Sequence, residues 1–160
     1  MSNIIFLDVD GVLNSINNLI EVYNKTKKPH SGYDYPFDEK CLKNLQTLVE
    51  QTKAKLVITS TWRKTEEGKE VLLKTLKEYG LDKEVIGYTP VHPSENRESE
   101  IKEYLSNLKE RINYIILDDY EEMGEYAKDL IKVSPQTGLT NKNVEDAVKR
   151  LNKKDIYMER

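Results

Sequence analysis

The chain has 160 residues, of which 33 % are charged and 38 % hydrophobic, a composition typical of a soluble domain with a sizeable core. The formal net charge of −3 excludes a general basic excess of the kind that favours nucleic-acid binding, but it allows a local basic patch. A single cysteine, Cys41, excludes an intramolecular disulfide, and no apolar run approaches the about 20 residues of a membrane span. The first residues show no basic segment with a small-residue cleavage site, so we expect one cytoplasmic domain over residues 1–160 with no membrane partner.

Five apolar segments predict β-strands, at residues 4–7, 56–59, 85–88, 114–117 and 130–133. Several are continuous apolar runs, which is typical of strands covered on both faces of a sheet. Longer segments between them repeat apolar residues at helical spacing, near residues 38–49, 65–80, 101–108, 123–127 and 140–151. Asp38, Thr65 and Thr140 are expected helix N-caps, and Gly80 is placed to end the second helix.

The alternation of strands and helices predicts a doubly wound α/β fold with a mainly parallel sheet and helices on both faces. Such sheets bind ligands beyond the carboxyl ends of their strands, near the point where the strand order reverses. One segment, residues 15–37, interrupts the alternation directly after the first strand. It begins with helical spacing and continues as a polar loop rich in aromatic residues, so we expect an insertion that overhangs a site at this edge.

Polar side chains follow three of the predicted strands. Asp8 and Asp10 follow the first strand, the sequence T-S-T-W-R at residues 59–63 ends the second, and Asp118 and Asp119 follow the fourth. Parallel strands bring these ends to one edge of the sheet, so we expect the side chains to converge there. Carboxylates held close together raise each other's cost of ionisation unless a cation neutralises them.

The chemistry of these side chains predicts a site for Mg²⁺ and a phosphoryl group. Mg²⁺ prefers oxygen ligands, commonly one or two carboxylates with waters and a substrate phosphate. Hydroxyl and guanidinium groups opposite the carboxylates suit phosphate oxygens. Gly11 lets the backbone approach the site, because it has no side chain to block the way.

The sequence resembles the haloacid-dehalogenase-like (HAD) hydrolases in D-V-D-G-V-L at residues 8–13, a hydroxyl at the end of the second strand, and L-D-D at residues 117–119. With I-T-S-T-W-R, N-R-E-S-E-I-K-E-Y-L and T-G-L-T it is similar to a small branch found in nucleic-acid (RNA) repair proteins. The resemblance extends over nearly the whole chain. It implies a five-stranded Rossmann-like sheet of order 3-2-1-4-5 with a minimal cap, and a Mg²⁺-dependent phosphatase.

By this resemblance Asp8 is the nucleophile that forms an aspartyl-phosphate, and Asp10 is the general acid and then the general base. The expected metal ligands are Asp8, Asp10 through its backbone carbonyl, Asp118, and Asp119 directly or through waters. Simpler alternatives exist for each residue. Asp8 would cap a loop, Asp10 would be a spacer in a metal site, and the two later aspartates would be charges in the first turn of a helix.

The phosphate-binding hydroxyl is expected at Ser60, with Thr59 next and Thr61 as a further candidate, because predicted strand ends vary by a few residues. Arg63 is expected to hold the phosphate or backbone of the substrate. Trp62 is expected to fill a gap in the core, with stacking on a base as the alternative.

The resemblance also implies a lysine or arginine before the fourth strand that stabilises the charge of the transition state. The sequence departs here from a clear lysine signature. Arg97, which opens the preceding helix, is our first choice for this catalytic residue, and Lys102 is its rival.

The insertion is too short for the large folded cap that many small-molecule phosphatases of this superfamily use. An open site suits a bulky substrate, so the first hypothesis is removal of a terminal phosphate from a nucleic acid or nucleotide. Candidates for binding a strand by charge and stacking are Lys25, Lys27, Lys28, Tyr33 and Tyr35, although a solvated loop is the alternative. Two other hypotheses stay open: a phosphatase for a small metabolite, and a catalytically silent phosphate-binding module. An RNA or DNA ligase or kinase is a candidate partner in trans.

Overall fold

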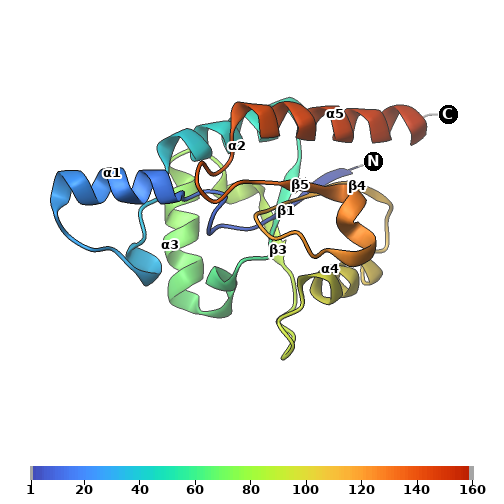
Figure 1. Cartoon of the computed structure of the whole chain (residues 1–160). Helices are drawn as coiled ribbons and strands as arrows, with labels where there is room; N and C mark the ends of the chain where they lie inside the picture. Colours follow the sequence, from blue (N-terminus) through green and yellow to red (C-terminus); the bar gives the residue numbers. More distant parts are fainter. Residues whose placement is uncertain (1, 159–160) are drawn as a thin grey trace.

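The computed structural model describes residues 2–158, with side chains described for residues 2–152. Its centre is a sheet of five parallel strands in the order β3-β2-β1-β4-β5 (Figure 1). The strands are β1 (Ser2–Leu7), β2 (Lys55–Ile58), β3 (Val85–Tyr88), β4 (Ile112–Asp118) and β5 (Leu130–Lys132). The predicted doubly wound fold and its strand order are therefore confirmed.

Helices cover both faces of the sheet (Figure 1). Buried side chains of α2 (Glu39–Thr52), α3 (Glu66–Lys77) and α5 (Asn141–Met158) form one hydrophobic cluster with the sheet. On the opposite face, α4 (Arg97–Ser106) and the 3₁₀ segment η4 (Gly124–Asp129) pack on a second cluster around Phe6 and Ile116. The short helix expected near residues 123–127 is thus a 3₁₀ segment. Among the described residues, no helix is apolar over enough turns to cross a membrane.

Local capping signals fix the starts of three helices. The side chain of Asp38 accepts a hydrogen bond from the Lys40 amide, and the Thr65 hydroxyl accepts one from the Gly68 amide. The Thr140 hydroxyl likewise accepts from the amide three residues later. All three predicted N-caps are confirmed, because each satisfies a backbone donor that the first helical turn leaves without a partner.

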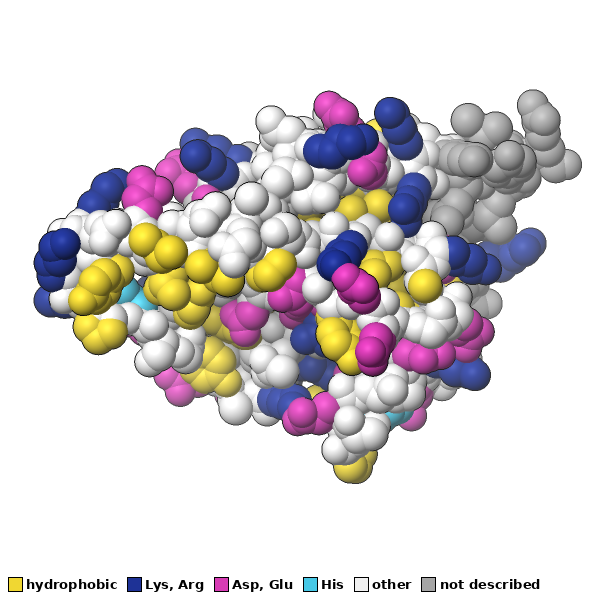
Figure 2. Space-filling view, in the orientation of Figure 1, with side chains coloured by type: hydrophobic (Ala, Val, Ile, Leu, Met, Phe, Trp, Pro, Cys, Tyr) yellow, Lys and Arg dark blue, Asp and Glu magenta, His cyan; other side chains and the backbone are white. Residues whose placement is uncertain are grey.

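The insertion after β1 folds as α1 (Ile16–Thr26) followed by a loop with the 3₁₀ segment η1 (Gly32–Asp34). α1 has no buried residue and projects from the sheet (blue in Figure 1). Figure 2 shows hydrophobic side chains gathered on this part of the molecule, where Ile20 and Tyr23 are about half exposed. Tyr33 of η1 connects the loop to the start of α3, because its hydroxyl oxygen lies 2.5 Å from the hydroxyl oxygen of Thr65.

The carboxyl ends of β1, β2 and β4 meet at one edge of the sheet. Leu7 is paired with the residues directly before Thr59 and Asp118, so Asp8 and Thr59, which follow their strands, lie level with Asp118, the last residue of β4. The Asp8 amide donates to the Leu117 carbonyl at 3.0 Å, and the Thr59 amide donates to the Leu7 carbonyl at 2.9 Å. The register therefore brings together the strand ends that the sequence singled out.

Candidate active site

Three carboxylates converge at this edge: Asp8 after β1, and Asp118 and Asp119 at the end of β4. One oxygen from each side chain lies within 4.8 Å of the others. Asp8 and Asp118 are buried, and Asp119 is half-buried. Burial raises the pKa of Asp8 well above its usual range, and the charge of Asp118 raises it further. This set of oxygen donors fits Mg²⁺, whose charge would remove the repulsion between them.

Arg97 lies against the same carboxylates. Its Nη1 is 3.0 Å from Asp8 Oδ1 and 2.5 Å from Asp118 Oδ2. Arg97 is the first residue of α4, where the N-cap Asn96 accepts a hydrogen bond from the Ser99 amide. Burial opposes the charge of Arg97, but the two carboxylates outweigh it and raise the pKa of the guanidinium above its usual value. A fixed cation therefore adjoins the expected nucleophile.

Lys102, the rival for this position, points to other partners. Its side chain is 68 % exposed, and its Nζ lies 3.4 Å from the Glu125 carboxylate. Among the described residues, only Arg97 of the two candidates contacts Asp8.

Gly11 is required by both its conformation and its neighbour. Its φ of +82° lies in the left-handed region, where side chains are strained. A Cβ at this position would lie 2.5 Å from Oδ2 of Asp119. The absence of a side chain therefore allows the β1 loop to pack directly against the acidic cluster.

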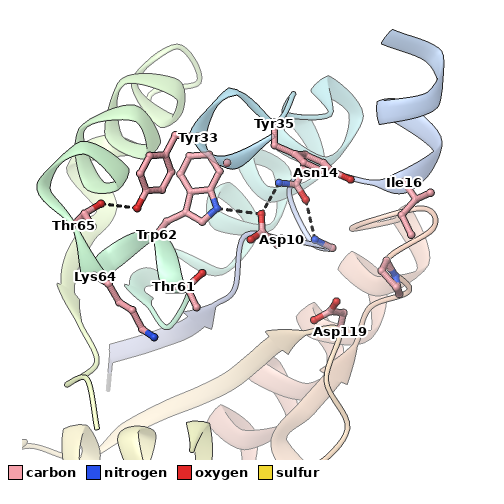
Figure 3. Close-up of a pocket in the computed structure, with 13 residues that line it drawn as sticks. Asp10, Asn14, Ile16, Tyr33, Tyr35, Thr61, Trp62, Lys64, Thr65 and Asp119 are labelled. Atoms are coloured by element: carbon pink, nitrogen blue, oxygen red, sulfur yellow. Dashed lines mark hydrogen bonds between the residues drawn. The ribbon is translucent and has the colours of Figure 1, made fainter. Parts of the chain in front are cut away.

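The side chain of Asp10 is not part of the cluster of three carboxylates. It is exposed and lines a neighbouring pocket. Its Oδ1 accepts hydrogen bonds from Asn14 Nδ2 at 2.9 Å and from Trp62 Nε1 at 3.1 Å (Figure 3). Asn14 in turn accepts a hydrogen bond from the Gly11 amide at 2.9 Å. Among the described residues, the carboxylates that lie within 4.8 Å of one another are those of Asp8, Asp118 and Asp119. For Asp10, the resemblance implies a contact to the metal through the backbone carbonyl.

Trp62 combines packing with a polar contact. The residue is 3 % exposed, and its ring meets Tyr33 and Phe37 edge-on, with centroids 5.1 and 5.3 Å away. The expected core position is confirmed, but the hydrogen bond to Asp10 is new. Asn14 directly follows the D-V-D-G-V-L segment, but its sequence pattern did not indicate a role.

The three candidate hydroxyls have different surroundings. β2 ends at Ile58, one residue earlier than predicted, so Thr59 is the first residue after the strand. The Thr59 Oγ1 is buried and has no hydrogen-bond partner within the described part of the chain. The first choice, Ser60, instead caps the 3₁₀ segment η2 (Thr61–Lys64), where its Oγ accepts from the Trp62 amide at 3.2 Å. Thr61 is exposed and lines the pocket beside Asp10.

The structure surrounds Arg63, which the sequence suggested as a substrate-binding residue, with partners from the protein itself. The side chain is 2 % exposed, and its Nη2 lies 3.0 Å from Oε2 of the buried Glu100. Its remaining N–H groups donate to four backbone carbonyls, those of Thr59, Ser60, Thr89 and Pro90. The guanidinium is fully used in joining segments of the chain, a function that a strand-end motif does not distinguish from phosphate binding.

Two pockets flank the acidic cluster, and Asp119 lines both. The first, of about 580 Å³, has Asp10 at one side and aromatic walls that include Tyr35 and Trp62 (Figure 3). The second, of about 620 Å³, is lined by Arg97 and the end of β4. Asp118 lines the second pocket as well, whereas Asp8 is buried and lines neither, so Asp119 is the carboxylate that a ligand can reach from both sides.

The insertion contributes unequally to the first pocket. Tyr33 and Tyr35 line it, and so does Lys64 of η2, which no sequence motif singled out. Lys25 instead pairs with Glu21 at 3.4 Å on the exposed surface of α1. The two further lysines of the insertion, at residues 27 and 28, are also exposed and do not line this pocket. The structure thus brings the tyrosines, but not the three lysines, to the candidate site.

A doubly wound parallel sheet with an acidic site after its first and fourth strands defines a HAD-like α/β domain. The sequence matches the family described as the HAD domain in Swiss Army Knife RNA repair proteins over residues 4–144, and the chain belongs to this family. The resemblance seen in the motifs is thereby confirmed, and HAD membership indicates a phosphatase-type hydrolase. Comparisons with curated proteins and with solved structures found no match.

Proposed function

We propose that this domain is a Mg²⁺-dependent phosphomonoester hydrolase that removes a terminal phosphate from a nucleic acid. The observation that carries the proposal is the contact of Arg97 with both Asp8 and Asp118 inside a cluster of three carboxylates. A cation site and a guanidinium next to one carboxylate suit a phosphoryl group, whose charge both would neutralise during transfer.

In the first step, a carboxylate oxygen of Asp8 attacks phosphorus while the bond from phosphorus to the leaving oxygen breaks. Asp10 gives its proton to that leaving oxygen. In the second step, water attacks the phosphorus of the aspartyl-phosphate, Asp10 takes a proton from the water, and the bond between phosphorus and Asp8 breaks. Inorganic phosphate departs, and Asp8 is restored as a carboxylate.

Asp8, Asp118 and Asp119 would hold Mg²⁺, together with the backbone carbonyl of Asp10. When bound, the ion supplies positive charge to the phosphoryl oxygens. Arg97 would donate hydrogen bonds to these oxygens from the opposite side of the cluster. For the phosphate-binding hydroxyl we favour Thr59, because a buried hydroxyl without a protein partner is costly and a phosphate oxygen would satisfy it.

Three observations support a nucleic-acid end as the substrate. The family to which the chain belongs is described from RNA repair proteins. The insertion is short, so the pocket beside Asp10 is open to a bulky leaving group. Tyr35 and Lys64 line that pocket and offer a ring for stacking and a positive charge for the phosphate backbone. A repair ligase or kinase acting on the same end would be the matching partner.

Release of inorganic phosphate from 4-nitrophenyl phosphate with Mg²⁺ tests the reaction class. We expect turnover by the wild type, none by Asp8→Asn, and a loss of about 10²–10³-fold in kcat for Arg97→Ala. A greater loss in Lys102→Ala than in Arg97→Ala would transfer the cationic role. If the wild type binds phosphate but hydrolyses nothing, the domain is a binding module and the proposal fails.

A substrate panel tests the second half of the proposal. It compares 3′- and 5′-phosphorylated RNA and DNA oligonucleotides with mononucleotides and sugar phosphates at equal Mg²⁺ concentration. We expect the highest kcat/KM for an oligonucleotide end. If a sugar phosphate or another small ester has the higher kcat/KM by a wide margin, the enzyme is a small-metabolite phosphatase.

A further inference from the structure

We propose that Trp62 and Asn14 are positioning residues that hold the Asp10 carboxyl group in the orientation needed for proton transfer to the leaving oxygen. The inference rests on the acid–base function proposed above for Asp10. It adds two residues that act through Asp10 without touching the reacting phosphoryl group.

Both hydrogen bonds to the Asp10 side chain reach the same atom, Oδ1. Its other oxygen, Oδ2, accepts no hydrogen bond from any described residue, and the exposed side chain lines the open pocket. The terminal torsion of an aspartate is broad and roughly two-fold, so an unrestrained carboxyl group would present either oxygen. Two donors on Oδ1 remove that freedom and leave Oδ2 for the substrate.

The two donors are themselves fixed. Asn14 is 2 % exposed, and its Oδ1 accepts from the Gly11 amide, so its NH₂ group must face Asp10. Trp62 is held by its edge-on contacts with Tyr33 and Phe37. An indole N–H and an amide NH₂ can only donate. Oδ1 is therefore occupied by both donors, and Oδ2 is the oxygen that stays open to the pocket and to a leaving group.

A proton donor matters most when the leaving group is poor. A 3′-phosphorylated oligonucleotide releases an alkyl alcohol that requires protonation, whereas 4-nitrophenyl phosphate releases a stable anion that does not. For Trp62→Phe, which keeps an aromatic ring and removes the Nε1–H donor, we expect about a 10-fold loss in kcat/KM on the oligonucleotide, since kcat/KM reports the steps up to departure of the leaving group and not the later attack of water. The loss in kcat/KM on 4-nitrophenyl phosphate should be less than about two-fold, because its leaving group departs without an acid.

Phe37→Leu is the matched control for packing. Phe37 supports the Trp62 ring, contributes no donor to Asp10, and does not line the pocket. This variant should change kcat/KM for the two esters by the same factor. Asn14→Ala, which removes the second donor and leaves the aromatic contacts intact, should reproduce the selective loss and decides the question if Trp62→Phe does not fold.

A double-mutant cycle with Asp10→Asn separates the positioning role of Trp62 from the acid function of Asp10 itself. If Trp62 acts through Asp10, Trp62→Phe will cause no further loss on the oligonucleotide in the Asp10→Asn background. Equal losses on the two esters for Trp62→Phe and Asn14→Ala, with a selective loss for Asp10→Asn, would overturn the positioning inference alone. If Asp10→Asn itself shows no dependence on the leaving group, the proposed acid function of Asp10 fails.

Discussion

Arg63 and Glu100 form a buried ion pair in which Nη2 lies 3.0 Å from Oε2, and their side chains are 2 % and 4 % exposed. The pair joins the segment after β2 to α4. Glu100 follows Arg97 by about one helical turn, so the ion pair fixes the turn that carries Arg97 to the acidic cluster. Glu100 also accepts a hydrogen bond from the His92 amide at 2.9 Å, which ties down the loop before α4.

Glu100→Gln leaves the Arg63 charge buried without its counter-ion. Removing one partner of such a pair costs about 3–5 kcal/mol of unfolding free energy, because the remaining charge is not compensated. We expect this loss in urea denaturation, together with a lower kcat as Arg97 loses its fixed position. Asp146→Asn, which breaks an exposed pair with Lys142, is the control and should cost less than about 1 kcal/mol. Equal losses in the two variants would contradict a structural role for the buried pair.

The fold was predictable because its signals are local and repeated. Continuous apolar runs marked the strands, and Asp38, Thr65 and Thr140 marked three helix starts that the structure confirms. The segment near residues 123–127 was misassigned in type, since apolar spacing alone does not separate an α-helix from a 3₁₀ turn.

The site was predictable at the level of segments but not of individual contacts. The parallel register brings Asp8 and Asp118 together whatever their neighbours are. The direction in which a side chain points depends on where the strand ends. Because β2 ends at Ile58, one residue before the predicted end, the buried hydroxyl without a partner among the described residues belongs to Thr59 and not to Ser60. The ion pair of Arg63 with Glu100 was not predictable, because Glu100 is distant in sequence and lies on another element.

Gly11→Ala should impair metal binding more than it impairs folding. The substituted residue would be strained at a φ of +82°. Its Cβ would lie 2.5 Å from Oδ2 of Asp119 and would therefore displace that carboxylate. Gly80→Ala is the matched control, because Gly80 has a φ of +70° with nothing within 4 Å of the added Cβ.

Both glycine variants should lose about 1–2 kcal/mol of stability from backbone strain. Only Gly11→Ala should need more Mg²⁺ for half-maximal rate, by about 10-fold or more, since displaced supporting groups weaken metal sites to that extent. An unchanged Mg²⁺ requirement in Gly11→Ala would show that Asp119 does not contribute to the metal site.

Mg²⁺ should stabilise the protein at neutral pH. Burial raises the pKa values of Asp8 and Asp118 in the folded state, so the folded chain holds protons that the unfolded chain releases. Their contribution to the unfolding free energy therefore falls as the pH rises from the ordinary value of 3.8 through the raised pKa values. Bound Mg²⁺ opposes this loss, by about 2.7 kcal/mol at 100 times its dissociation constant.

Thermal melts with and without Mg²⁺ across a pH series check this prediction. Asp118→Asn should abolish the Mg²⁺ shift in Tm, flatten the pH dependence, and leave the metal-free protein at least as stable as the wild type at neutral pH. A full Mg²⁺ shift in Asp118→Asn would place the ion elsewhere.

Thr59→Val and Ser60→Ala should have opposite effects on stability and activity. The Thr59 hydroxyl is buried without a partner in the described part of the chain, so replacing it with an isosteric methyl group removes an unsatisfied polar atom. We expect Thr59→Val to be as stable as the wild type or more stable, while kcat/KM falls because the phosphate loses a hydrogen-bond donor.

Ser60→Ala should lose about 0.5–2 kcal/mol of unfolding free energy, since the Ser60 Oγ caps η2, and should keep most of its activity. Urea denaturation and phosphate release, measured on both variants, test the two expectations together. A large fall in kcat/KM for Ser60→Ala with normal turnover in Thr59→Val would return the phosphate-binding role to Ser60.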